Sequence, residues 1–324
     1  YYVKFSSLNC NLKFLKLNTN KINILSDIYF VIKIYYLLFK IKPDYIFNYT
    51  IKPVIFISFF SYFYKCKIIN VITGFGTLYL KNKIYQKIFN FLYFISQKNI
   101  HKIIFQNDDD KNYFIKNKLV DGNKTKIING SGVDTEYFHS SEYPKTKVIN
   151  FLFLGRLIKE KGIIELVEAF KKLLKEKQSI RLILVVKENK NNPSSINNII
   201  YDLINKNNME IIKNPIDVRK YIKMSHCLVL PSYREGLSKS CLEAMSMERP
   251  ILVSNVPGCK QLVEKNKNGL IFNSIDKNGI YVVLKKFIDS NNNIKKQMGK
   301  YSRAIIIKKY SIKIINKYYL ELIK

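Results

Sequence analysis

The sequence predicts an α/β protein with two domains, each built on a doubly wound parallel sheet. Apolar runs of about four to eight residues alternate with longer segments that carry apolar residues at helical spacing. This alternation indicates βαβ units, whose strands are parallel. The pattern occurs on both sides of a turn-rich segment, and a length of 324 residues suits two domains of ordinary size.

The first half is expected to begin its regular structure with a basic, aromatic helix. Ser26 and Asp27 are typical of a helix start, and Pro43 ends the helix expected at 28–41. The other elements expected in this half are strands at 45–48, 67–72 and 102–106 and a helix at 84–96.

Residues 129–144 are rich in turn-forming residues and mark the predicted junction between the domains. In the second half, strands are expected at 148–154, 180–186, 209–212, 227–230, 250–254 and 269–272. Helices are expected at 160–175, 195–205, 217–224 and 239–247, and then to the C-terminus. Two such sheets face each other across a cleft at the carboxyl ends of their strands, where open α/β sheets bind ligands.

The composition is strongly basic, with 55 Lys and Arg against 24 Asp and Glu and a net charge of +31. The chain is also crowded with Ile, Asn, Tyr and Phe, which AT-rich codons encode, so drift toward Lys is one explanation of the charge. The other is attraction to an anionic partner such as a phospholipid surface, a diphosphate or a nucleic acid. Nucleic acid is disfavoured because Arg, which makes bidentate contacts with bases and phosphates, is scarce.

Cysteine and histidine usage argues against structural metal and disulfides. The five cysteines are scattered without C-x-x-C spacing, which is typical of a reducing cytosol, and the three histidines form no H-x-x-x-H pair. No apolar run reaches the length of about 18 residues that a membrane-spanning helix needs, and the N-terminus lacks the layout of a signal peptide. We therefore expect a cytoplasmic protein without a metal ion.

A predicted diphosphate site lies between the strand at 148–154 and the helix that follows. Gly155, at the end of the strand, lets the backbone approach a ligand, and the helix offers free N–H groups and the positive end of its dipole. Arg156 and Lys161 add two cations to the same turn. These groups suit a diphosphate without a metal ion, whereas a solvated basic loop is the alternative that the sequence leaves open.

A second predicted site is the turn that follows the strand at 227–230. Glu235 lies in this turn and Glu243 lies eight residues later on the next helix, with the backbone amides of 236–238 between them. Carboxylates accept hydrogen bonds from the hydroxyl groups of a sugar or a ribose, and amides donate to phosphate oxygens. The alternative is that both glutamates are ordinary surface charges.

Asp108, Asp109 and Asp110 have the D-x-D spacing of some metal sites. They follow a strand and open a predicted helix, where carboxylates accept hydrogen bonds from free amides and stabilise the helix dipole. We therefore interpret them as the N-terminal cap of that helix rather than as metal ligands.

Together these segments resemble the retaining glycosyltransferases of family 4, which have the GT-B architecture of two facing Rossmann-like domains. The resemblance covers nearly the whole chain, and its motifs occur in the family's order. They are N-G with G-V-D at 129–134 and Phe138, G-R-L-x-x-E-K-G at 155–162, E-x7-E at 235–243, P-G at 257–258 and N-G at 268–269. It implies an acceptor-side domain at 1–140, a donor-nucleotide-binding domain at 141–302, and a terminal helix at 303–324 that returns to the first domain.

The resemblance implies a role for each matching residue. Glu235 would be the catalytic-site carboxylate that holds the donor sugar, and Glu243 would bind the ribose. Arg156 and Lys161 would hold the diphosphate. The other donor-binding positions implied are Gly155, Gly236, Leu237 and Ser238. It also implies a hexosyltransferase that takes a nucleotide sugar, expected to be UDP-linked, and needs neither a metal ion nor a cofactor.

Three features of the sequence depart from the family pattern. The family begins with a strand and a glycine-bearing loop, so the first domain is expected to lack its initial βαβ unit before Tyr1. The turn at 73–76 carries no His, which many relatives have there, and Gln261 stands where a Glu is frequent. These differences concern the acceptor side and the subfamily.

A finer resemblance concerns the acceptor. T-I-K-P at 50–53 with I-T-G-F-G at 72–76 looks like a bacterial subgroup that adds a hexose or N-acetylhexosamine to an undecaprenyl-diphosphate-linked sugar in surface-polysaccharide biosynthesis. A glycolipid or polysaccharide acceptor would give the aromatic first half a purpose, with contact to the anionic inner face of the cytoplasmic membrane. Ordinary core packing of the aromatics is the alternative. Lysines flank the Phe and Tyr residues of this half and would contact the anionic surface: Lys33, Lys40, Lys42, Lys65 and Lys67.

The sequence leaves three alternatives to glycosyl transfer. One is a truncated, non-catalytic remnant that still binds a nucleotide sugar. Another is a different GT-B enzyme such as a sugar-nucleotide epimerase, which the two turn motifs fit less well. The third is a basic nucleic-acid-binding protein, for which the sequence has no recognised motif.

Overall fold

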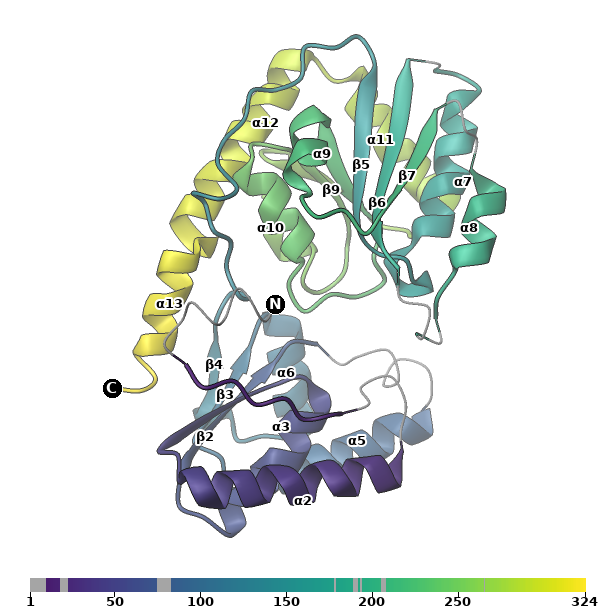
Figure 1. The fold of residues 1–324 in the computed structure, drawn as a ribbon. Helices are drawn as coiled ribbons and strands as arrows, with labels where there is room; N and C mark the ends of the chain where they lie inside the picture. The colour runs from purple at the N-terminus through teal and green to yellow at the C-terminus, as the bar shows by residue number, and fades with distance from the viewer. Residues whose placement is uncertain are drawn as a thin grey trace.

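The computed structural model shows two parallel sheets, one in each half of the chain, with helices packed around them (Figure 1). It describes residues 10–17, 23–74, 83–177, 179–188, 192, 194–204, 208–264 and 266–324. Phe75 and Gly76, which belong to the predicted turn at 73–76, lie outside the described residues. Within them, the predicted class of two parallel-sheet α/β domains is confirmed.

The first sheet has four parallel strands in the order β1-β2-β3-β4. The strands are β1 (Tyr45–Tyr49), β2 (Lys67–Ile72), β3 (Lys102–Phe105) and β4 (Thr125–Ile127). The helices between and before them are α2 (Ile24–Ile41), α3 (Ile51–Ser58), the short 3-10 helix η1 (Phe59–Tyr62), α5 (Lys83–Ser96), α6 (Asp108–Lys116) and the 3-10 turn η2 (Gly122–Lys124). Strand β4 was not predicted, because a three-residue run with a central lysine carries no period.

The second sheet has six parallel strands in the order β10-β9-β8-β5-β6-β7. The strands are β5 (Ile149–Arg156), β6 (Ile180–Lys187), β7 (Met209–Lys213), β8 (Cys227–Leu230), β9 (Ile251–Ser254) and β10 (Gly269–Phe272). Their helices are α7 (Ile163–Leu174), α8 (Asn197–Leu203), α9 (Arg219–Met224), α10 (Lys239–Ser246) and α11 (Lys277–Asp289). This is the order of a dinucleotide-binding sheet, whose direction of winding reverses between β5 and β8.

The helix predicted at 160–175 begins later than expected, at Ile163. Residues Lys159–Lys161 form a 3-10 turn instead, and Gly162 ends it with a φ of 66°. A Cβ at Gly162 would lie 2.1 Å from the carbonyl oxygen of Pro231, so only glycine fits here. This later helix start matters for the site, because Gly162 brings the turn after β5 into contact with the turn after β8.

The chain crosses between the two domains twice, at the left of Figure 1. The first crossing is the linker near Val133, and the second follows α12 (Asn292–Ile305), a π-helical segment (Ile306–Tyr310) and α13 (Ile312–Leu320). The crossings are bonded together, since the Val133 N–H donates to the Tyr310 carbonyl at 3.0 Å and the Ile312 N–H donates to the Val133 carbonyl at 2.9 Å.

Helix α13 returns to the first domain and packs on its sheet. Ile315 is 1% exposed in a small core with Ile69, Val71 and Ile104 of β2 and β3, and Ile128 completes it. Each domain also has its own larger core. The last helix therefore covers one face of the first sheet although it follows the second domain in sequence.

Replacement of Ile315 by Ala is expected to loosen this contact, because it removes buried apolar atoms and leaves a cavity. The cost should be about 2–5 kcal/mol. Hydrogen exchange of the β2 and β3 amides measures it, with Leu320→Ala, a change in a side chain that is 55% exposed on the same helix, as the matched control. Equal protection in the two variants would contradict the packing role of α13.

Candidate functional site

The candidate site lies where the winding of the second sheet reverses, at the carboxyl ends of β5 and β8. The two strands are neighbours, with Phe151 beside Cys227 and Leu152 beside Leu228. The loops that leave them, at 155–162 and 231–238, both point toward the first domain (Figure 1). Open α/β sheets bind ligands at such a reversal, so the topology brings the two sequence-predicted motifs to one place.

Arg156 and Lys161 occupy different environments in the first loop. Arg156 ends β5 and is exposed, where it is available to an anion. Lys161 ends the 3-10 turn, and its side chain is only 12% exposed. Gly155 lies beneath them, and a Cβ there would come within 3.2 Å of the Phe153 ring.

Lys161 and Glu235, predicted separately for diphosphate and for sugar, bind each other. The Lys161 ammonium donates to Oε1 of Glu235, and the Ser232 hydroxyl donates to the same oxygen at 2.7 Å. The Glu235 side chain is 14% exposed. Both contacts are made to Oε1 of Glu235, so the Lys161 ammonium is paired within the domain and Oε2 has capacity to accept further hydrogen bonds.

Of the three amides predicted to face a ligand, one is already used within the domain. The Ser238 N–H donates to the Gly258 carbonyl at 3.2 Å, and the Ser238 hydroxyl caps α10 by accepting from the Cys241 N–H. This hydrogen bond occupies the Ser238 N–H, because the segment at 257–258 runs close beside the turn. Gly236 and Leu237 remain as candidate donors, and Leu237 packs against the position of Gly130 in the linker.

Glu243 lies on α10 with a side chain that is 13% exposed. Burial raises the pKa of this carboxyl to about 7, and Lys239, 4.0 Å away and largely exposed, lowers it only partly. A carboxyl buried with so little compensation is typical of a binding site, where a ligand supplies the missing hydrogen bonds.

The structure also brings together residues that the sequence did not connect. Asp110, which is 0% exposed, accepts a hydrogen bond from the Arg234 guanidinium of the second domain. Asn107 donates to the carbonyl of Gly236 at 2.8 Å. Arg234 stands beside Glu235 in sequence, which was the available signal, but nothing local identified its partner.

The aspartate run at 108–110 forms the first turn of α6, and the capping residue is Asn107. The side chain of Asn107 accepts from the Asp110 N–H at 2.7 Å, so the predicted cap is shifted by one residue. Within the described part of the chain, no group of three or more His, Cys, Asp or Glu side chains is placed to hold a metal ion.

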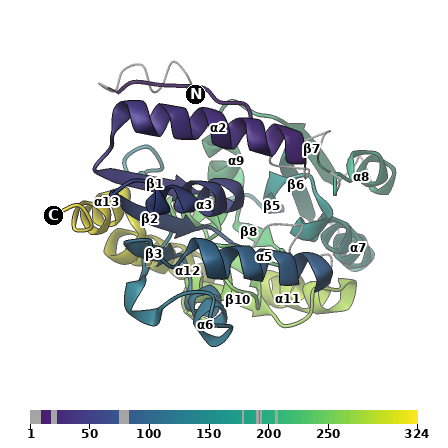
Figure 2. The ribbon, with the colours of Figure 1, turned by 90° about the horizontal axis from the view of Figure 1, so that it is seen from below.

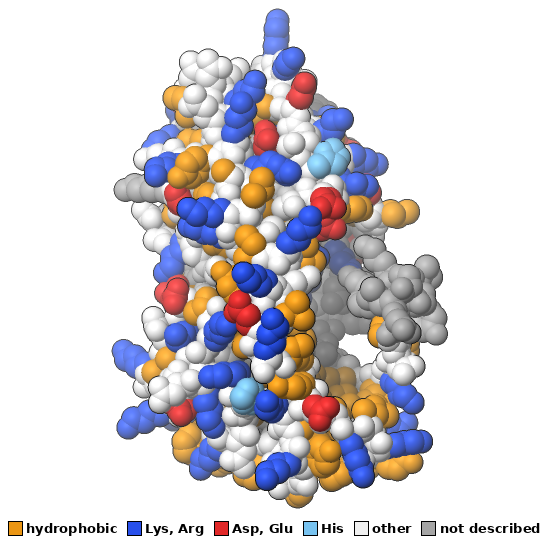
Figure 3. All heavy atoms as spheres, turned by 90° about the vertical axis from the view of Figure 1, so that its left-hand side faces the viewer, with side chains coloured by type: hydrophobic (Ala, Val, Ile, Leu, Met, Phe, Trp, Pro, Cys, Tyr) orange, Lys and Arg blue, Asp and Glu red, His pale blue; other side chains and the backbone are white. Residues whose placement is uncertain are grey.

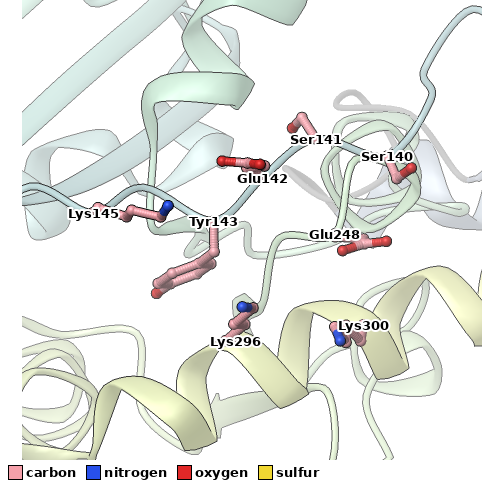
Figure 4. Close-up of a pocket in the computed structure, with 8 residues that line it drawn as sticks. All are labelled: Ser140, Ser141, Glu142, Tyr143, Lys145, Glu248, Lys296 and Lys300. Carbon is pink, nitrogen blue, oxygen red and sulfur yellow. The ribbon is translucent and has the colours of Figure 1, made fainter.

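A separate hollow of about 400 Å³ lies between the linker and α12 (Figure 4). Lys296 and Lys300 of α12 line it from below, opposite Glu142, Tyr143 and other residues of the linker. None of the sequence-predicted site residues lines this hollow, so it is distinct from the candidate site.

Comparison with known proteins identifies the family. The family model described as glycosyl transferases group 1 matches residues 134–305, which is more than half of the chain. The chain belongs to this family. The matched region contains both turns of the candidate site, so the two motifs of this group 1 glycosyltransferase lie in the part that defines the family.

Two curated relatives align with most of the chain. A *Staphylococcus aureus* capsular polysaccharide biosynthesis glycosyltransferase, CapM, is 25% identical over 74% of this chain and 62% of its own length. An *Escherichia coli* protein named UDP-Gal:alpha-D-GlcNAc-diphosphoundecaprenol alpha-1,3-galactosyltransferase is 25% identical over 79% of this chain and 69% of its own length. The chain thus spans less than two thirds of the first relative.

Solved structures confirm the GT-B arrangement of the group 1 glycosyltransferase. *Anabaena* Alr3699/HepE, solved with UDP and glucose, superposes with a TM-score of 0.79 at 15% identity, covering 94% of this chain and 84% of its own. A glycosyltransferase from *Rickettsia africae* superposes with a TM-score of 0.75 at 18% identity, covering 95% and 83%. At these identities the likeness concerns the fold.

The raised pKa of Glu243 predicts a pH-dependent stability difference. Because the folded-state pKa of about 7 exceeds the ordinary value of 4.5, the stability present below 4.5 is lost as the pH rises through 7. Glu243→Gln is therefore expected to match the wild type at pH 4 and to exceed it at pH 8 by about 3 kcal/mol, at about 1.36 kcal/mol per pKa unit.

Urea unfolding at the two pH values measures this difference. Glu168→Gln, a change in an exposed carboxyl on α7, is the matched control and should stay within about 0.5 kcal/mol of the wild type at both. A stability gain in Glu243→Gln that is the same at pH 4 and pH 8 would contradict the burial of a titrating carboxyl.

Proposed function

We propose that this group 1 glycosyltransferase transfers a hexose or N-acetylhexosamine from a UDP-sugar to a lipid-linked or polysaccharide-precursor acceptor, with retention of configuration and without a metal ion. The observation that carries the proposal is the convergence of Arg156, Lys161, Glu235 and Glu243 at the reversal point of the second sheet. Two cations and two carboxylates there match the charges of a diphosphate and the hydroxyl groups of a sugar and a ribose.

The proposed roles follow from the chemistry of the departing nucleotide. When the bond between the sugar and the diphosphate breaks, negative charge grows on the diphosphate. Arg156, Lys161 and the N–H groups of Gly236 and Leu237 would stabilise that charge, as fixed donors do for other developing anions. Glu235 would orient the sugar through its hydroxyl groups, and Glu243 would accept hydrogen bonds from the ribose diol.

The relatives support the choice of donor and acceptor. The *Anabaena* protein has been solved with UDP-glucose, and the *E. coli* relative is named for transfer from UDP-galactose to a sugar on diphosphoundecaprenol. The *S. aureus* relative is named for capsular polysaccharide biosynthesis. We extend these names to this chain as a proposal, because the site offers groups that suit the same classes of molecule.

We further propose that the first domain contacts an anionic membrane through α2. Exposed apolar side chains recur along this helix at helical spacing, at Leu25, Ile28, Ile32, Tyr36 and Phe39. Helices α2 and α5 lie on either side of α3 at the end of the molecule seen in Figure 2. A single helix face of this kind is typical of a segment that lies in the plane of a lipid interface.

The charges on and near α2 also favour contact of this helix with an anionic membrane. The one acidic residue of α2, Asp27, is buried and accepts a hydrogen bond from Lys52 at 2.7 Å, so it does not oppose an anionic lipid. The five lysines predicted to contact an anionic surface are all exposed: Lys33, Lys40, Lys42, Lys65 and Lys67. Elsewhere basic side chains are scattered over both domains, as the face in Figure 3 shows.

This contact would place the enzyme at the inner face of the cytoplasmic membrane, beside a lipid-linked acceptor. Among the described residues, no helix combines the length and the apolar character needed to cross a bilayer. Attachment through the α2 surface would therefore be peripheral.

Arg156→Ala is expected to weaken the binding of UDP by about tenfold to a hundredfold, because it removes a charge-assisted contact with the diphosphate. Titration calorimetry with UDP, UDP-glucose, UDP-galactose and UDP-N-acetylglucosamine measures the loss and identifies the preferred sugar. Arg181→Ala, which removes an arginine paired with Glu210 on the same sheet, is the matched control and should bind as the wild type does.

No binding by the folded wild-type chain would refute the donor site. Binding without transfer to a lipid-linked acceptor would favour the nucleotide-sugar-binding remnant, and conversion of the bound sugar to its epimer would favour an epimerase.

The double variant Ile32→Ser with Tyr36→Ser is expected to bind vesicles containing phosphatidylglycerol about tenfold more weakly than the wild type, because each change removes apolar area from the interface. Vesicle co-sedimentation measures this, with Ile216→Ser and Val282→Ser, exposed apolar positions of the second domain, as the matched control. Equal binding of both variants, or binding to neutral vesicles alone, would contradict the proposed surface.

A further inference from the structure

The turn that carries Glu235 is held from both domains. Within its own domain, the Glu235 N–H donates to the Pro257 carbonyl at 3.3 Å and the Tyr233 N–H donates to the Glu160 carbonyl at 3.0 Å. From the first domain, Asp110 binds Arg234 on one side of Glu235, and Asn107 binds the carbonyl of Gly236 on the other. The residues on either side of the proposed sugar-binding carboxylate are thus both held by contacts with the first domain.

Asp110 is itself oriented by Asn107, so the two act as one unit. The Asn107 amide nitrogen lies 3.0 Å from Oδ2 of Asp110 and 2.8 Å from the Gly236 oxygen, and donates to both. The remaining oxygen of Asp110 accepts from Arg234. Asp110 is completely buried and the Arg234 side chain is 24% exposed, which makes this the most buried of the cross-domain ion pairs among the described residues.

Two other contacts join the domains near the Asp110–Arg234 pair, and the ion pair among them is more exposed. Asp109 of the first domain and Lys260 of the second also pair, at 3.0 Å, but their side chains are 43% and 39% exposed. The Gln261 amide donates to the Gln106 carbonyl at 3.1 Å. An exposed ion pair is weakened by water and salt, whereas a buried pair fixes its partners in one geometry. The Asp110–Arg234 contact is therefore the one suited to set the position of the turn.

We infer that Asp110, oriented by Asn107, is a positioning residue for the donor site, which acts through Arg234 and the Gly236 backbone to hold Glu235 against the donor sugar. This rests on the proposed function. Arg156 and Lys161, on a separate loop, would also hold the diphosphate, so loss of the Asp110 contact affects recognition of the sugar more than that of the nucleotide. The first domain thereby takes part in donor selection without touching the donor.

The inference predicts a change in one ratio, the affinity for a UDP-sugar divided by the affinity for UDP. Asp110→Asn keeps the shape of the side chain and removes its charge, so the ionic contact with Arg234 is lost and the turn loses one of the contacts that fix the position of Glu235. The ratio is expected to fall by about tenfold or more, as expected when a positioned group is slightly misplaced, while the affinity for UDP itself changes less because Arg156 and Lys161 still hold the diphosphate. Titration calorimetry with UDP, UDP-glucose and UDP-N-acetylglucosamine measures it.

Three further variants separate positioning from other effects. Asp109→Asn makes the same chemical change one residue away in the exposed pair, and should leave the ratio within about twofold of the wild type. Arg234→Gln should lower the ratio as far as Asp110→Asn does, and the double variant should fall no further, because both changes break one contact. Circular dichroism establishes that each variant is folded.

An unchanged ratio in folded Asp110→Asn would overturn the inference. A fall in Arg234→Gln alone would also overturn it, since Arg234 would then act on the ligand directly. Failure of the wild-type chain to bind any UDP-sugar would refute the proposed function and this inference together, whereas wild-type binding with an unchanged variant ratio refutes this inference alone.

Discussion

The close approach of the Gly236 backbone to the end of β2 is the constraint on which the rest of the site depends. A Cβ at Gly236 would lie 2.1 Å from the Thr73 carbonyl oxygen, so the two domains meet there with no space for a side chain. Gly162 and Gly258 allow similarly close contacts on the other sides of the turn, against Pro231 and Glu235. Three glycines thus let backbone pack on backbone, and polar side chains at the turn's edges meet at hydrogen-bonding distance.

Burial raises the pKa of both Asp110 and Glu243, but the two carboxyl groups differ in their partners. Asp110 is wholly buried, which raises its pKa, but Arg234 and Asn107 offset the cost by binding its two oxygens. Glu243 is buried with only the exposed Lys239 nearby, and its pKa rises to about 7. The first carboxyl has protein partners on both oxygens and is suited to structure. The second has a capacity for hydrogen bonds that the described protein leaves unused, which suits a ligand.

Much of this arrangement could be predicted from the sequence because it is local. Apolar runs at the strand period and helical spacing such as that of Leu166, Phe170 and Leu173 in α7 identify the two sheets. The turns at 155–162 and 235–243 also carry their residues within one loop. The Asp110–Arg234 contact joins residues 124 positions apart, and no period or motif connects them. The late start of α7 was not predicted for a similar reason, since the steric constraint on Gly162 comes from Pro231, which is distant in sequence.

The two chain crossings limit how the domains can move relative to each other. A Cβ at Gly132 would lie 2.9 Å from the Ile312 Cα, and the two crossings are bonded on both sides of Val133, so they form one stiff hinge. Helix α13 fixes the far side of that hinge to the first sheet through Ile315. A rotation of the domains about this hinge would separate the contacts between the two turns, including that of Asp110 with Arg234. Because the same contacts flank Glu235, the contact between the domains and the ordered position of the Glu235 carboxylate are coupled.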